Sequence, residues 1–504
     1  MKTPPPAEPQ ITRCEHNGKG EVYDVGPGKK YERLGQVPFA TLEAGDMVRV
    51  HWRKEPYRDA LLLSSQGRPD RPIRLCGVRG PQGERPVIDA NGAVISSEQA
   101  LPKEWAGMGL ILVNRKQNDD WETYAPAHLR IEGLHLRGAR EGARFYLADG
   151  TPDSFGRDSA CISILRGVDV TLRDNEIEDC GFGIFVKSSD MAPERVSDLL
   201  IEGNYLHDNN PSTDWSVHSL YLQGFGVTVQ FNHLGVTKFG NNLKDRSVGA
   251  VIRYNWIEPS AAHLLDLVEA EEHKKTAVLD PRYRQTFVYG NVMKHLTSSS
   301  VVHYGGDHQD QVAYFRKGEL FFFNNTVVIA DRPGEEVPWG QGVFVVETVD
   351  ERVRAFNNII DYRGSAQAFE LMAIKEIHAE LEQGGYVILG KNWLPQRWER
   401  CNKDENPYYR DRLKLGADHE LGVLEGANAV ICQPSEPLLA GTFQPTPELA
   451  NAGEALSAAL VAAGHDVSYE YDPELGDPKV PLTQIRRRVP RGNALALGAL
   501  EERE

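Results

Sequence analysis

The sequence predicts an all-β chain that forms a right-handed parallel β-helix, a solenoid of roughly ten coils with capping segments and a short C-terminal helix. A motif of the form apolar-x-x-Asn-x-apolar recurs between residues 172 and 394 of the 504-residue chain. Successive motif asparagines lie 23 to 36 residues apart, which is typical of coils joined by loops of variable length. Asn-Gly and Asp-Gly hairpin turns are few, which disfavours a sandwich or barrel of hairpins.

The motif asparagines are expected to be structural. A buried asparagine amide can bond to the backbone of neighbouring coils and form a ladder, and it tolerates left-handed backbone geometry. The Val, Ile, Leu and Phe residues around it alternate as the inward face of short parallel strands. The predicted ladder consists of Asn175, Asn204, Asn232, Asn255, Asn291, Asn325, Asn358 and Asn392.

The chain divides into four predicted parts. Residues 1–20 are polar and Pro-rich and form a flexible N-terminal arm, 21–128 form an N-terminal cap and the first coils, 129–395 form the β-helix core, and 396–504 form a C-terminal cover. Two stretches have helical patterns. Phe369–Gln383 is interpreted as an insertion, and Pro447–Ala463 as a helix capped by Thr446 and ended by Gly464.

Charge and hydropathy exclude several partners. The net charge of −16 disfavours nucleic acid, whose binding depends on Lys and Arg. No stretch of about 18 apolar residues is present, so no membrane span is predicted. Met1–Gln10 contains no apolar region, so the sequence as given predicts no signal peptide. The expected compartment is the cytoplasm, or the periplasm or exterior if the sequence starts at a mature terminus.

Six cysteines are too few for a disulfide framework in a chain of this length, and none forms a Cys-x-x-Cys pair. Zinc binding through cysteine is therefore not predicted. Two alternatives remain open: free buried thiols, or one disulfide between Cys161 and Cys180, which would meet if the chain coils.

Alignment of the coils predicts an outward-facing row of side chains, which we call the ribbon. Tyr221 and Lys244 each lie 11 residues before a ladder asparagine, and their neighbours Leu220 and Leu243 should point inward. Asn242 and Arg246 share the parity of Lys244 and are placed on the same face. The predicted ribbon is Phe185, Tyr221, Lys244, Asp266, His303 and Glu347.

Acidic and basic side chains on a rigid face suit β-elimination or C5 epimerisation of a uronate. A base removes the proton α to the carboxylate, a cation or amide neutralises that carboxylate, and elimination also needs an acid. Lys244 or Tyr221 is the candidate base or acid. Lys244 would need a pKa well below its usual value, which Arg246 favours. Arg246 and Asn242 would hold the carboxylate and His218 or His303 would move the proton, while Asp266 and Phe185 are predicted to bind substrate.

Two other polar segments are interpreted as structural. The Gly-rich stretch from Gly305 to Asp310 is expected to be a turn rather than a metal site. The acidic run from Glu269 to His273 is expected to be a solvated loop.

The chain resembles bacterial right-handed parallel β-helix repeat proteins over roughly residues 40–500. The resemblance lies in His218-Ser219-Leu220-Tyr221, in Asn242-Leu243-Lys244-Asp245-Arg246-Ser247 and in Ile252-Arg253-Tyr254-Asn255. More distantly, the lysine 11 residues before a ladder asparagine is similar to the chondroitinase B and alginate lyase group, in which such a lysine is the base. Of the functional residues of that group, only the lysine base has a counterpart in this sequence, Lys244. Thr237 and Phe239 stand where that group has calcium-binding acids, so no cofactor is predicted.

The sequence thus favours a carbohydrate-active enzyme whose partner is a polysaccharide, acting as a lyase or epimerase on a uronate-containing polymer. Two alternatives are kept: a non-catalytic glycan-binding or cell-surface module, and a glycan hydrolase or depolymerase. A hydrolase requires two carboxylates about 5–9.5 Å apart, and Asp266 and Glu347 are the only acids of the ribbon.

Overall fold

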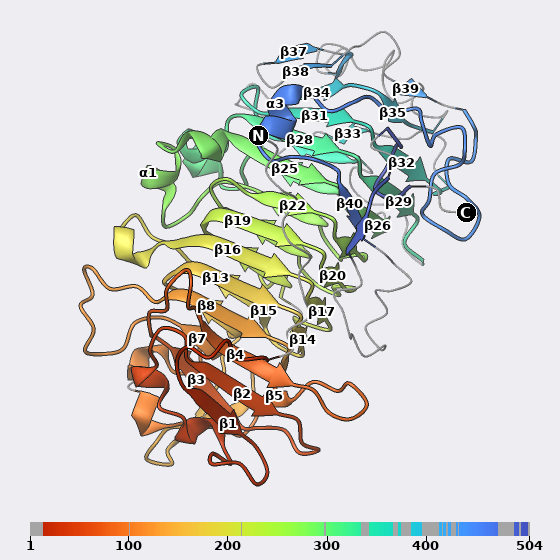
Figure 1. Cartoon of the computed structure of the whole chain (residues 1–504). Coiled ribbons are helices and arrows are strands. Elements are labelled where there is room, and N and C mark those ends of the chain that lie inside the picture. Colours follow the sequence, from red (N-terminus) through yellow and green to blue (C-terminus); the bar gives the residue numbers. More distant parts are fainter. Residues whose placement is uncertain are drawn as a thin grey trace.

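The computed structural model confirms the predicted fold class, because its strands stack in long parallel sheets along one rod (Figure 1). The structure describes residues 14–99, 101–212, 214–296, 299–333, 342–365, 371–373, 385–395, 413–415, 417–419, 422–424, 430–431, 433–471, 488–492 and 495–501. Residues 1–13 of the expected arm and much of the expected C-terminal cover lie outside these ranges. Within them, no helix is long and apolar enough to cross a membrane.

Three sheets form the walls of the rod, two of 13 strands and one of 11 in the described part of the chain. Sheet I faces the viewer in Figure 1 and contains β1 (Val22–Val25), β2 (Met47–His51), β4 (Ile73–Val78), β8 (Ala127–Glu132), β13 (Gly167–Arg173), β16 (Val196–Glu202), β19 (Phe225–Gln230), β22 (Val251–Arg253), β25 (Gln285–Tyr289), β28 (Glu319–Phe323), β31 (Arg352–Phe356), β34 (Tyr386–Leu389) and β36 (Leu413–Leu415).

Sheet II contains β11 (Pro152–Ser154), β10 (Arg144–Tyr146), β6 (Ala93–Ile95), β3 (Asp59–Leu63), β7 (Gly109–Val113), β12 (Ala160–Ile164), β15 (Phe182–Val186), β18 (Leu220–Leu222), β21 (Leu243–Asp245), β24 (Leu265–Leu267), β27 (Val302–Tyr304), β30 (Phe344–Val346) and β33 (Met372–Ala373). Sheet III contains β5 (Val87–Asp89), β9 (His135–Arg137), β14 (Glu176–Glu178), β17 (Tyr205–His207), β20 (His233–Leu234), β23 (Trp256–Ile257), β26 (Val292–Leu296), β29 (Thr326–Ala330), β32 (Ile359–Tyr362), β35 (Asn392–Trp393) and β39 (Val430–Ile431).

Each coil passes through sheets I, III and II in turn, and neighbouring coils pair in parallel. The strands β13, β14 and β15 form one coil, and β16, β17 and β18 form the next. Apolar residues stack inside the rod at paired positions, such as Leu172 on Ile201 and Ile184 on Leu220, all fully buried. A coil cannot bury these side chains alone, so the stack shares one core.

The asparagine ladder forms as predicted, at the turn between sheets I and III. From Asn204 onward, Oδ1 of each ladder asparagine accepts two hydrogen bonds from the preceding ladder asparagine, one from its backbone N–H and one from its Nδ2. The first such pair is Asn175 and Asn204, and the last is Asn358 and Asn392. The left-handed geometry, however, belongs to the residue before the ladder asparagine in every ladder coil except that of Asn392. Asp174, Phe231 and Tyr254 have φ of 54°, 54° and 56°, and Gly203 and Gly290 take the same position in their coils.

Two disulfides are present among the described residues. Cys161–Cys180 is the pair that the sequence left open, and Cys14–Cys76 was not predicted. Their Cα atoms lie 5.6 and 5.7 Å apart, a normal span for a disulfide. The sequence could not reveal the second pair, because it requires the N-terminal segment to fold back onto β4.

The helical predictions need correction. The C-terminal helix is only α3 (Ala458–Ala462), and its cap is Ser457 rather than Thr446, because Ser457 Oγ accepts the Leu460 amide. The segment predicted as Phe369–Gln383 lies mostly outside the described residues, and its Met372–Ala373 form β33. A short helix that was not predicted, α1 (Lys274–Ala277), follows β24.

The C-terminal part of the described chain packs along the side of the rod. Leu460 and Val467 contact an outward aromatic row on sheet I that includes Phe287 and Phe321. The strands β40 (Tyr469–Tyr471) and β41 (Arg488–Pro490) pair antiparallel, as do β37 (Ala417–His419) and β38 (Gly422–Leu424). Figure 1 shows β40 in dark blue across this side of the rod.

Replacing one ladder residue should destabilise the whole rod. Asn255→Ala removes the acceptor for the amide N and Nδ2 of Asn232 and the Nδ2 donor to the Val229 carbonyl, all in buried residues. We expect the free energy of unfolding to fall by about 3 kcal/mol or more, because several buried polar groups lose their partners. Denaturant unfolding measures this change. The exposed Asn118→Ala is the control, and an equal loss in both variants would contradict the role of the ladder.

Candidate functional site

The ribbon lies on the outward face of sheet II, in the predicted register. Strand pairing places Phe185 beside Tyr221, Tyr221 beside Lys244, Lys244 beside Asp266, and Asp266 beside His303. The last predicted member is shifted, because Val345 pairs with His303 and Glu347 lies two residues further along. Its parity is unchanged, and the Glu347 carboxylate still reaches the His303 ring.

Lys244 is held between two carboxylates. Its Nζ donates to Asp266 Oδ2 and to Asp307 Oδ2, both at 2.5 Å, and the residue is 8% exposed. Burial by itself would lower the pKa of Lys244, but the two aspartates outweigh burial and raise it. The lysine therefore stays protonated in the unliganded protein. Arg246 does push the pKa of Lys244 down, as expected, but the two aspartates outweigh it, so the low pKa that a lysine base would need is absent.

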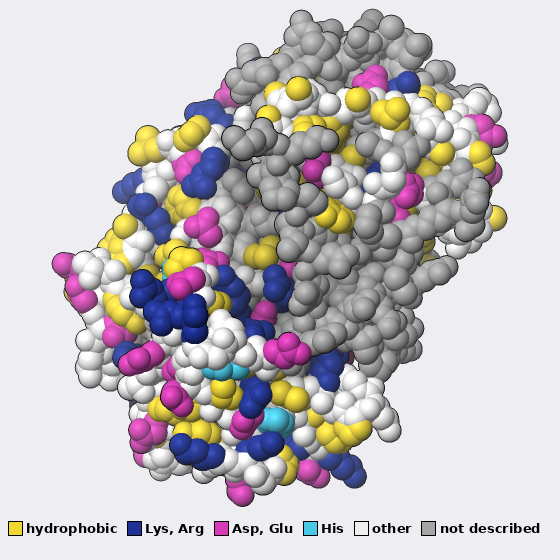
Figure 2. All heavy atoms as spheres, in the orientation of Figure 1, with side chains coloured by type: hydrophobic (Ala, Val, Ile, Leu, Met, Phe, Trp, Pro, Cys, Tyr) yellow, Lys and Arg dark blue, Asp and Glu magenta, His cyan; other side chains and the backbone are white. Residues whose placement is uncertain are grey.

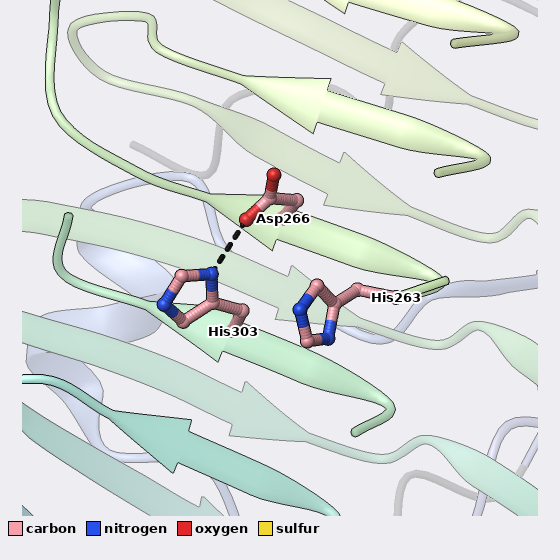
Figure 3. A group of neighbouring side chains, drawn as sticks. All are labelled: His263, Asp266 and His303. Atoms are coloured by element: carbon pink, nitrogen blue, oxygen red, sulfur yellow. Dashed lines mark hydrogen bonds and ion pairs between the residues drawn. The ribbon is translucent and has the colours of Figure 1, made fainter. Parts of the chain in front are cut away.

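His303 connects Asp266 to Glu347. Its Nδ1 lies 2.8 Å from Asp266 Oδ1 and its Nε2 lies 2.5 Å from Glu347 Oε1 (Figure 3 shows the first contact). In each contact the ring nitrogen and the carboxylate share one hydrogen. Burial opposes ionisation of Asp266, yet Lys244 and His303 hold its pKa well below the usual range. The three residues form a buried, charge-assisted chain.

Arg246 and Lys244 hold one carboxylate between them. Arg246 Nη2 lies 3.1 and 3.2 Å from the two oxygens of Asp307, whose side chain is 24% exposed. Burial would raise the pKa of Asp307, but His308, Lys244 and Arg246 lower it strongly. Lys244 and Arg246 thus form a binding site for one carboxylate at the accessible edge of the cluster. We call this pair of cations the carboxylate seat.

The other end of the ribbon is aromatic. The ring of Phe185 stacks on Tyr221 at 5.4 Å, and His218 stacks on the same tyrosine at 5.9 Å. Tyr221 donates its hydroxyl hydrogen to Glu271, and burial raises its pKa above the usual range. His218 accepts the Asn241 amide at Nδ1, and burial and Lys244 lower its pKa to about 3. His218 is therefore neutral.

Asn242 lies apart from the cluster, in contrast to the prediction from parity. Its amide bonds to Thr237 Oγ1 and to the Glu258 carbonyl, and the residue is fully buried. It lies just before β21, where the chain is still turning, so strand alternation does not apply. The neighbouring Asn241 enters the cluster instead and donates to Asp266 Oδ2 at 2.9 Å.

Four acidic or basic residues of the cluster come from loops that sequence analysis interpreted as structural. The loops after β24 and β27 leave sheet II at the same edge and fold over Arg246. Glu269 is fully buried, and its carboxylate accepts the amides of Asp307 and His308, so the acidic run is not a solvated loop. Glu271 contacts Tyr221 and Arg246. The periodicity of the coils carries no signal for such loop contacts.

Three groups within the described residues have donor atoms in range of one metal ion. Glu178 with His207 and Asp208 lies on and after sheet III, and the two at the ribbon are His263 with Asp266 and His303, and Glu269 with Asp307 and His308. Imidazole nitrogens suit zinc or other transition metals, whereas calcium prefers six to eight oxygens. Lys244 already neutralises Asp266, and Arg246 already neutralises Asp307 and Glu269. A metal ion at the ribbon would have to compete with these cations, so neither ribbon donor set favours one.

No family model and no curated protein matches the sequence. Similar solved structures include the GH136 lacto-N-biosidase from Eubacterium ramulus, 11% identical over 74% of this chain and 67% of that chain, with a TM-score of 0.39. The PL6 family alginate lyase AlyGC is 10% identical over 80% of this chain and 56% of that chain, with a TM-score of 0.34. The pectate lyase Pel9A is 12% identical over 68% of this chain and 78% of that chain, with a TM-score of 0.35. The likeness concerns the fold alone.

His308 should make stability depend on pH. Its hydrogen bond to Asp307 raises its pKa to about 9, so the stabilisation is complete below about pH 6.5, the unfolded value, and is lost as pH rises through 9. We expect the difference in Tm between the wild type and His308→Gln to be largest near pH 6 and to shrink toward pH 9. Thermal melts across this range measure it. A difference that grows with pH would contradict the contact.

Proposed function

We propose that the protein is a carbohydrate-active enzyme that acts on a uronate-containing polysaccharide as a lyase or epimerase, with the ribbon as its active site. The observation that supports this best is the seat formed by Lys244 and Arg246, which holds the Asp307 carboxylate on an outward sheet face beside Tyr221. A uronate carboxylate has the same charge and shape. Binding there would neutralise it and acidify the adjacent C–H bond.

The proposed roles follow from the charges. Lys244 and Arg246, both cationic, neutralise the substrate carboxylate after the Asp307 side chain turns away. The raised pKa of Tyr221 keeps its phenol protonated, which suits a general acid for the departing oxygen. The Asp307 carboxylate, once it has left the two cations, is the base that takes the proton α to the substrate carboxylate, while the bond of Lys244 to Asp266 keeps the ammonium charged. His303 and Glu347 hold Asp266 in this position. Phe185 offers a flat apolar surface next to Tyr221.

Hydrolysis by the two ribbon carboxylates is less well supported. Asp266 and Glu347 bond to opposite sides of the same His303 ring, so the imidazole fills the space between them. A glycosidase needs that space for the sugar and, in the inverting case, for a water molecule.

A non-catalytic glycan-binding module is the second candidate. Trp215 precedes β18, is 56% exposed, and packs edge-on against Phe239 of the next coil with ring centroids 5.7 Å apart. An exposed aromatic side chain held rigidly near the ribbon is a suitable surface for a sugar ring. We also propose an oxidising compartment, secreted or periplasmic, because disulfides such as Cys14–Cys76 and Cys161–Cys180 persist there.

Removing the Lys244 ammonium should abolish catalysis. With acidic polysaccharides, the wild type should produce the ultraviolet absorbance of unsaturated uronate, or incorporate deuterium from solvent at C5 if it is an epimerase. Lys244→Ala should lose at least about 100-fold in rate, because it removes a cation that neutralises the developing charge. Circular dichroism checks that the variant is folded.

The control is Lys238→Ala, an exposed lysine on the same coil, which should keep full activity. If neither absorbance nor deuterium incorporation appears with any acidic polymer, the enzymatic proposal is wrong. Retarded migration in polysaccharide-containing gels, lost in Trp215→Ala, would then support the binding module.

A further inference from the structure

A second candidate binding site lies away from the ribbon, on the outward face of sheet I. It is a pocket of about 280 Å³ over β2, β4, β8 and β13, toward the N-terminal end of the rod. Figure 2 shows this side of the molecule, and Lys and Arg side chains gather on it at the level of β4 to β16. The ribbon lies on sheet II, so the two sites are separate.

Three arginines line the pocket. Strand pairing places Arg74 directly beside Arg130, and Arg173 beside Glu132. Their side chains are 24%, 19% and 24% exposed, so each guanidinium is partly accessible. Glu132 is the one acidic lining residue, and it lies 3.0 Å from Arg74 and 3.6 Å from Arg173. The lining is therefore cationic in a chain whose net charge is −16.

The acids outside the lining fix the arginines without filling the pocket. Asp169 bonds to Arg130 at 2.9 Å, and Glu202 bonds to Nε of Arg173 at 2.9 Å. Nη2 of Arg173 donates no hydrogen bond within the described part of the chain. Because each guanidinium is oriented before any ligand arrives, little conformational entropy is lost on binding.

One wall of the pocket is the N-terminal segment, which contributes His16 and Asn17. The Cys14–Cys76 disulfide ties this segment to β4, and Arg74 Nη1 donates to the Glu15 carbonyl at 3.0 Å. The Glu21 amide is bonded to Asp46 Oδ1 at 2.8 Å at the other end of the wall. One side of the pocket is thus formed by a segment that is fixed at both ends.

We propose that this pocket binds an oxyanion carried by a molecule about the size of one sugar residue. The N–H groups of an arginine guanidinium have the spacing of the oxygens of a carboxylate or phosphate. Hydrogen bonds between such charged groups are stronger than hydrogen bonds between neutral groups. The volume of about 280 Å³ lies just below the ~300–1,000 Å³ typical of drug-sized ligand sites and fits a single sugar residue. The site does not depend on the function proposed for the ribbon.

Isothermal titration with D-glucuronate, inorganic phosphate and uncharged D-glucose tests the proposal on the full chain. At least one of the two anions should bind, and glucose should not. Arg130→Gln should weaken anion binding by about tenfold or more, because it removes a charge-assisted contact. The matched control is Arg140→Gln. Arg140 is partly exposed and ion-paired like the pocket arginines but lies outside the pocket, so this variant should bind like the wild type. If Arg130→Gln does not fold, Arg173→Gln replaces it.

Lys244→Ala separates this site from the ribbon. Anion binding that persists in Lys244→Ala and is lost in Arg130→Gln supports the arginine pocket. Binding that is lost in Lys244→Ala and unchanged in Arg130→Gln places the anion at the ribbon and overturns this proposal, while it supports the carboxylate seat. No binding of either anion, or equal binding of glucose, also overturns it.

Discussion

Each ladder asparagine from Asn175 to Asn358 bonds to the asparagine of the next coil, and through these contacts the coils of this part of the rod are held in one register. Asn204, for example, accepts from Asn175 and donates to Asn232. A parallel sheet places paired residues about 4.8 Å apart. Once the ladder fixes the register, side chains from residues far apart in sequence, such as Tyr221, Lys244 and Asp266, form one continuous row. The site is therefore a consequence of stacking.

The register alone does not complete the site, because the charges on the row need partners. Lys244 and Arg246 are nearly buried, and buried cations without counter-charges would be strongly destabilising. The loops that follow β24 and β27 supply these counter-charges through Glu269 and Asp307. Both loops leave the same edge of sheet II. Variation in coil length, visible in the sequence as irregular asparagine spacing, is thus what allows the polar cluster to form.

The parts of the structure that follow from periodicity were predictable, and those that depend on loops were not. The fold class, the ladder and the pairing from Phe185 to His303 follow from a two-residue alternation and a recurring asparagine. Asn242 was misplaced because alternation fails one residue outside a strand. Asp307 and Glu269 were assigned to a turn and a solvated loop because loop residues have no period. The Cys14–Cys76 disulfide required a fold-back that no local pattern marks.

The position of Asp307 explains how such a cluster can be stable and still accept a ligand. A carboxylate seat that stayed empty would leave two adjacent cations, Lys244 and Arg246. Their remaining counter-charges would be Asp266, Glu269 and Glu271, and the loss of Asp307 would lower both pKa values. Asp307 fills the seat from within the chain, and at 24% exposure its side chain is more accessible than those of Asp266 and Glu269. Exchange of Asp307 for a ligand carboxylate would keep the charge of the cluster constant. Binding would then be a competition between two carboxylates rather than the burial of a new charge, which lowers its electrostatic cost.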